Sequence, residues 1–157
     1  MIALLALLLA IAPPGRVTLG VYESWAAFRD QGPTRCFAIA APVRAGASTR
    51  LRPFASVASH FGRSNRSALF VRLSTARNLA VPVTLSIDDR RFTLSGGDAA
   101  AWAPDAQTDR AIVAAMRGAR SMSVAAVSDR GTPFADTYAL AGAATAIDAA
   151  ALGCARR

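Results

Sequence analysis

The sequence predicts a mainly β fold, namely an antiparallel β-sandwich-like domain with one helix after its central hairpin and a short C-terminal helix. Three observations support this prediction. Short β-prone runs alternate with turn residues along most of the chain, a helical periodicity follows them once, and an alanine-rich segment closes the sequence. The 157 residues suffice for one hydrophobic core, so we expect a leader over residues 1–15 and a single β-sandwich-like domain over residues 16–157.

The expected strands are short runs of alternating or β-branched residues bounded by turn residues. In chain order they are residues 17–22, 25–29, 36–41, 55–61, 68–74, 83–87, 91–95, 121–127 and 134–140. The clearest pair is the hairpin of 83–87 and 91–95, whose alternate apolar side chains share one face. These side chains are Val83, Leu85, Ile87, Phe92 and Leu94. Asp88 and Asp89 favour a turn between the two strands.

A helix is expected over residues 105–119, where apolar residues from Ile112 to Ala119 recur at helical spacing. Asp105 or Thr108 can cap its start, because a short oxygen-bearing side chain can accept a hydrogen bond from the free amide groups of the first turn.

A second, shorter helix is expected over residues 142–152, which are rich in alanine. We predict that it presents Ile147 and Leu152 to the core and delivers Cys154 at its end.

The chain opens with an uncharged apolar run over residues 1–12, which Pro13, Pro14 and Gly15 interrupt. This run is shorter than the roughly 20 apolar residues that a membrane-spanning helix needs. A cleaved signal peptide therefore fits best, and the mature protein is expected to be periplasmic or secreted. An uncleaved anchor, a buried core segment and a misassigned start are the alternatives.

The two cysteines, Cys36 and Cys154, stand near opposite ends of the chain. Export into an oxidising compartment predicts that they form a disulfide, which in the chain-entropy model is worth roughly 4 to 5 kcal/mol for so large a loop. Free thiols, a metal pair and a redox couple are the competing interpretations. The single histidine, His60, does not complete a zinc set, and no Cys-x-x-Cys motif is present.

All 18 basic residues are arginines, and the formal net charge is +8. They recur along the chain, which is typical of a solvated surface. Guanidinium groups bind carboxylates and phosphates bidentately, so Arg50, Arg52, Arg63 and Arg66 are candidate contacts to an anionic surface. We do not expect a nucleic-acid partner, because such a groove would interleave basic with aromatic residues, and only the polar stretch 60–66 approaches that pattern.

The residues provide no recognisable reaction centre. A serine nucleophile would need His60, and no Gly-x-Ser-x-Gly motif marks a serine. Asp88 and Asp89 suit a hairpin turn, and Asp105 and Asp109 suit the start of a helix. We therefore predict no catalytic, cofactor-binding or metal-ligating residues and no cofactor. A hydrolase of unrecognised type, using His60 or an aspartate pair, is the enzymatic alternative.

Several segments, read in order, carry a resemblance to a known family. They are Trp25-Ala-Ala-Phe-Arg29 with Arg35-Cys-Phe-Ala-Ile39, the hairpin over residues 83–94, the helix and strand over residues 112–124, and the closing segment over residues 138–149. Together they resemble the invasion-associated locus B family of small exported bacterial proteins. Members often carry further cysteines near the first strand and after the hairpin, where this chain has none, so the resemblance implies no disulfide pairing.

The resemblance implies a β-sandwich-like exported protein with an envelope or host-interaction role and no catalytic residues. Together with the leader, it predicts a non-catalytic periplasmic or secreted protein whose partner is a protein or another part of the cell envelope. A binder of anionic polymers or lipid surfaces, acting through its arginines, is the alternative within the class of binding proteins.

Overall fold

The computed structural model describes residues 15–32, 34–60 and 66–155, so the predicted leader lies outside it except for Gly15. The strands are β1 (Arg16–Tyr22), β2 (Trp25–Gln31), β3 (Thr34–Ala40), β4 (Phe54–His60), β5 (Arg66–Arg72), β6 (Val83–Ile87), β7 (Arg90–Gly96), β8 (Ala100–Trp102), β9 (Ser121–Val127) and β10 (Pro133–Ala139). They form an open antiparallel sheet in the order β1-β2-β3-β4-β5-β8-β7-β6-β9-β10. The helices are α1 (Ala106–Gly118) and α2 (Ala143–Ala155). The predicted mainly β, sandwich-like fold is confirmed.

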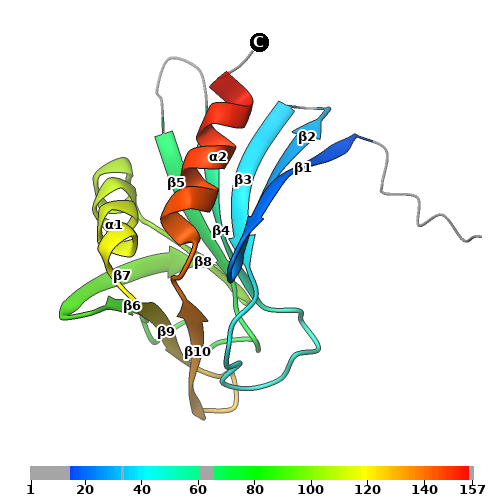
Figure 1. Ribbon diagram of the computed structural model, residues 1–157. Helices are drawn as coiled ribbons and strands as arrows, with labels where there is room; N and C mark the ends of the chain where they lie inside the picture. The colour runs from blue at the N-terminus through cyan, green and yellow to red at the C-terminus, as the bar shows by residue number, and fades with distance from the viewer. Residues whose placement is uncertain (1–14, 33, 61–65, 156–157) are drawn as a thin grey trace, which may run out of the picture.

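Both helices pack on the same face of the sheet (Figure 1). Helix α2 lies against β1 to β4, and α1 lies against β5 and β7. Alternate strand residues facing the helices are buried, among them Ala27, Cys36, Val57, Leu69, Val71, Leu85, Val124 and Tyr138. In the described part of the chain, no helix covers the opposite face of the sheet. We call it the outer face.

The central hairpin is formed by β6 and β7 as the sequence predicts. Val83 pairs with Leu94 and Leu85 pairs with Phe92, which places the predicted apolar side chains on one face. The turn residue Asp88 has a φ of 52°, in the left-handed region that aspartate tolerates better than most residues.

Strand β8 was not expected from the sequence, because three residues are too few for an alternating pattern to be recognised. It pairs with Phe70 to Arg72 on β5 and with Ser95 and Gly96 on β7, and so joins the two halves of the sheet. The close approach depends on Gly96, because a Cβ there would overlap the carbonyl oxygen of Ala100.

Helix α1 begins where the sequence predicts. Its N-cap is Asp105, whose side chain accepts a hydrogen bond of 2.7 Å from the amide of Thr108.

Helix α2 extends to Ala155, so Cys154 lies inside its last turn. Ile147 is buried as predicted, but the prediction for Leu152 is wrong, since it is 57% exposed. Five residues of an α-helix turn through about 140° beyond one full revolution, so Ile147 and Leu152 cannot share a face.

The sheet is curled so that the end of β10 lies next to the start of β2. The indole nitrogen of fully buried Trp25 donates to the carbonyl oxygen of Ala139 at 2.9 Å. Thr137 on β10 forms an isolated bridge with Arg44, in the loop between β3 and β4. This loop therefore covers the outer edge of β10. Within the described residues, neither helix is long and apolar enough to cross a membrane.

Candidate functional site

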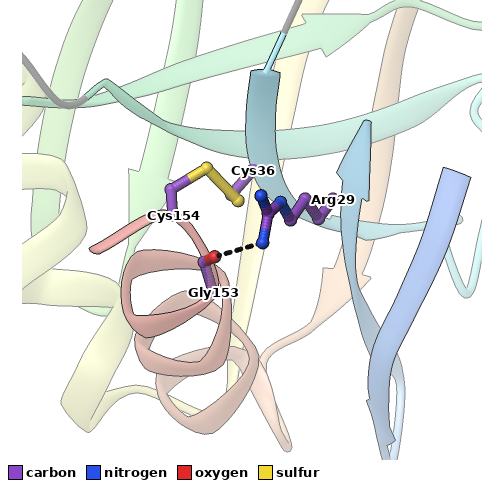
Figure 2. Close-up of a disulfide and its surroundings, with 4 residues drawn as sticks. All are labelled: Arg29, Cys36, Gly153 and Cys154. Atoms are coloured by element: carbon purple, nitrogen blue, oxygen red, sulfur yellow. Dashed lines mark hydrogen bonds between the residues drawn. A yellow bond between two sulfur atoms is a disulfide. The ribbon is translucent and has the colours of Figure 1, made fainter. Parts of the chain in front are cut away.

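The disulfide joins the sheet to the C-terminal helix. Cys36 on β3 is fully buried, and its sulfur is bonded to that of Cys154 across a sequence separation of 118 residues (Figure 2). The Cα atoms are 5.8 Å apart. The predicted pairing is therefore present, and in the disulfide neither sulfur is a thiolate that could ligate a metal. The described residues contain no cluster of three or more His, Cys, Asp or Glu side chains that could hold a metal.

Arg29 reinforces this junction. Figure 2 shows its guanidinium beside the last turn of α2, where it donates to the carbonyl oxygen of Gly153 at 3.5 Å. A cation at this position is favourable because the C-terminal end of a helix carries partial negative charge and free carbonyl groups. The disulfide and the hydrogen bond from Arg29 together hold the C-terminal end of α2 against β2 and β3.

A second set of residues lies on the outer face, where strand alternation directs side chains away from the helices. It consists of five aromatic residues and three arginines from β1 to β5 and β8, and we call it the aromatic–arginine face. Its members are Phe28, Phe37, Phe54, Phe70, Trp102, Arg16, Arg35 and Arg72. Phe28 pairs across the strands with Phe37, and Phe70 pairs with Trp102.

The aromatic rings of this face touch one another across neighbouring strands. The ring centroids of Phe28 and Phe37 are 5.8 Å apart, and those of Phe54 and Phe70 are 5.9 Å apart. The rings of Phe70 and Trp102 are nearly parallel, at 5°, with centroids 6.5 Å apart. Trp102 is 41% exposed and therefore presents an indole surface to solvent.

The arginines lie over these rings. The guanidinium carbon of Arg35 is 5.0 Å from the centroid of Phe37, and that of Arg72 is 5.2 Å from the centroid of Phe54. Arg16 covers Phe37 at 5.2 Å and also binds Asp30 through two hydrogen bonds. The hydrogen bond from Arg16 lowers the pKa of Asp30 below its ordinary value.

This face contains a hollow of about 560 Å³. Small side chains at Ser56, Ala58 and Ala68 contribute to its lining beside Phe54, Phe70, Trp102, Ala103, Leu69, Arg35 and Asp109. Asp109 accepts a buried hydrogen bond of 2.9 Å from the amide of Leu69, just beyond the residues of β5 that pair with β8. Its position at the start of α1 was predicted, but its bond to the sheet was not.

Of the four arginines named from the sequence, the structure describes Arg50, Arg52 and the backbone of Arg66, which lie at two ends of the sheet. Arg50 and Arg52 lie in the loop before β4, are exposed, and line two different hollows. Arg66 begins β5 opposite His60, at the far end of β4, roughly 20 Å away along the strand. Arg63 and the side chain of Arg66 lie outside the described residues, so their contact with an anionic surface stays a prediction.

The residues of the enzymatic alternative are placed as follows. The side chain of His60 lies outside the described part of the structure, while Asp88 and Asp89 form the turn of the central hairpin. Asp105 caps α1, and its hydrogen bond to Thr108 lowers its pKa. Each described aspartate in this group therefore has a structural position that needs no reaction to explain it.

The aromatic–arginine face was not predicted from the sequence, where only the stretch 60–66 was seen to approach a pattern of interleaved aromatic and basic residues. The signal was present at a spacing of two, in Arg35-Cys36-Phe37 and Phe70-Val71-Arg72. In a strand, residues two apart lie on the same face, so each triplet places one arginine beside one phenylalanine. Assembling the face also required the order of the strands, which no single segment contains.

Comparison with family models identifies the family, and comparison with solved structures shows the fold. A family model described as Invasion associated locus B (IalB) protein matches residues 28–151. Among solved structures, the fold is similar to the crystal structure of invasion associated protein B from Bartonella henselae, with a TM-score of 0.65. The two share 13% sequence identity over 90% of this chain and 99% of that one, so the likeness concerns the fold. Comparison with curated proteins finds no match.

Proposed function

The chain belongs to the invasion-associated locus B family, and we propose that it is an exported, non-catalytic interaction protein of the bacterial cell envelope. The observation that carries this proposal is the disulfide between Cys36 and Cys154. Structural disulfides persist in the periplasm and outside the cell but are rare in reducing cytoplasm. The apolar run at residues 1–12 supports the same compartment.

Binding rather than catalysis is the activity that the described surface supports. The aromatic–arginine face offers the exposed ring of Trp102, beside less exposed phenylalanine rings, and exposed cations from several strands. Aromatic residues and arginines are enriched in recognition surfaces. Its partner is a protein or another component of the envelope.

Expression of the full chain in a bacterium, followed by fractionation and thiol alkylation, tests the export. We expect the protein in the periplasm or the medium, shortened at its N-terminus, with neither cysteine alkylated until a reductant is added. A chain lacking residues 1–14 is the control and should stay in the cytoplasm. Retention of the full chain in the cytoplasm with both thiols free would contradict the proposal.

Affinity capture from the cell envelope at low and high salt tests the interaction. A defined partner that survives high salt supports a specific surface, whereas loss of all captured material at high salt would indicate general electrostatics of the arginines.

A further inference from the structure

The hollow in the aromatic–arginine face has the dimensions and lining of a ligand site. Ligand pockets commonly measure about 300–1,000 Å³, and this hollow measures about 560 Å³. Small side chains at Ser56, Ala58 and Ala68 leave room between the larger Phe54 and Trp102. Aromatic surface and a hollow therefore occur together on a face that neither α1 nor α2 covers.

Few charged side chains lie near the hollow, and they differ in whether they form an ion pair. Arg16 is held by Asp30 through its two hydrogen bonds, so it is already neutralised. Arg35 and Arg72 are exposed and form no salt bridge within the described residues. Arg35 lines the hollow, and Asp109 contributes a carboxylate to the same lining. The site thus suits a ligand with apolar ring faces and a sparse negative charge.

From these contacts we propose that the hollow binds a glycan that bears carboxylates. A sugar ring packs its C–H face on the exposed indole of Trp102, and a carboxylate of the same chain pairs with Arg35. Strands β3 and β8 are three strand spacings apart, roughly 14 Å, so the two contacts require more than one sugar unit. The inference rests on the proposed function, since such glycans lie in the envelope and outside the cell.

The same observations disfavour other occupants. Single-stranded nucleic acid carries a phosphate at every unit and is bound by continuous positive grooves, whereas here Asp30 and Asp109 interrupt the positive charge. A second copy of the chain would bring the same cations together across the symmetric interface. An anionic lipid surface is flat and would leave the hollow unfilled.

Trp102 provides the measurement. The chain has two tryptophans, and Trp25 is fully buried while Trp102 is 41% exposed. Titration of the mature exported protein with tetragalacturonate should change the Trp102 emission saturably. Chitotetraose, an uncharged chain of the same length, should bind about tenfold more weakly, since a charge-assisted hydrogen bond contributes at least that factor.

Variants followed by calorimetry locate the binding. Trp102→Ala and Arg35→Gln should each weaken tetragalacturonate binding about tenfold or more. Arg91→Gln is the matched control and should have no effect, because Arg91 is exposed on the outer face of β7 outside the hollow. Thermal unfolding of each variant establishes that it is folded.

Four results would overturn the proposal. They are equal affinity for chitotetraose, unchanged binding in both variants, tighter binding of an oligothymidylate or of phosphatidylglycerol vesicles that competes at the same face, and absence of any binding to tetragalacturonate. Export and the envelope capture are measured separately, so a secreted protein that fails here leaves the proposed function standing.

Discussion

In the first half of the sheet, β1 to β5 with β8, a disulfide fastens α2 to β3 and aromatic rings occupy the outer face. The second half comprises β6, β7, β9 and β10. There, the buried side chains of Asp136 and Arg77 hold the backbone of neighbouring segments in place through hydrogen bonds. Asp136 is fully buried and accepts hydrogen bonds from the amides of Gly46 and Ser74, at 2.8 and 2.9 Å. Arg77, 9% exposed, donates to the carbonyl oxygens of Gly96, Gly97 and Val81.

The two outer faces differ in the same way. On the second half this face carries Arg91 and otherwise mostly small residues, namely Thr84, Ser86, Thr93, Ser95, Ser121, Ser123, Ala125, Ala135 and Thr137. The first half carries the proposed recognition surface and is joined to α2 by the disulfide on its helix-covered face. In the second half, buried side chains hold the neighbouring loops through hydrogen bonds to the backbone.

Removal of the disulfide should have the largest effect on this arrangement. The Cys36→Ala, Cys154→Ala double variant should lose about 4 kcal/mol of unfolding free energy, because the open chain regains the entropy of a loop with a 118-residue separation. Urea unfolding measures it, and adding reductant should destabilise the natural chain but not the variant. Amide exchange should accelerate more in β3 and α2 than in β10. A loss under about 1 kcal/mol would contradict the covalent account of the first half.

Asp136→Ala should have the next largest effect, and in the second half. It leaves the buried amide of Ser74 and the part-buried amide of Gly46 without an acceptor, at a cost of about 3 kcal/mol. Asp136→Asn retains one acceptor and should fall between. Asp129→Ala, at an exposed neighbouring turn, is the control and should change the unfolding free energy by less than about 0.5 kcal/mol. Equal losses of unfolding free energy for Asp136→Ala and Asp129→Ala would show that the buried hydrogen bonds of Asp136 do not stabilise the second half.

The sequence predicted most elements because their signals are local. The β6–β7 hairpin follows from alternation within a few residues, and the cap of α1 is one of the two candidates, Asp105 and Thr108, that lie at its start. The disulfide also followed, since only two cysteines were available to pair.

The buried side-chain hydrogen bonds of the second half could not be predicted, because their partners are backbone groups far along the chain. Asp136 binds amides 90 and 62 residues away, and nothing in its neighbours distinguishes it from the exposed Asp129. The aromatic–arginine face depends on the strand order, in which β8 inserts between β5 and β7. Non-local topology thus determines both the buried hydrogen bonds and the candidate site.

The ion pair between Arg117 on α1 and Asp148 on α2 connects the helix at the junction of the halves to the helix of the first half. The hydrogen bond from Arg117 lowers the pKa of Asp148 below its ordinary 3.8. A lowered folded-state pKa stabilises the protein above that ordinary value, and the stabilisation is lost as the pH falls through the folded-state pKa. Both side chains are largely exposed, so solvent screening limits the effect to about 0.5 kcal/mol. Asp148→Asn should therefore be slightly less stable than the natural chain in urea unfolding at pH 7, and the difference should narrow as the pH is lowered below 3.8. A difference above 2 kcal/mol at pH 7 would show that this pair, rather than the strand pairing through β8, couples the two halves, whereas a difference that grows in acid would contradict the ion-pair explanation.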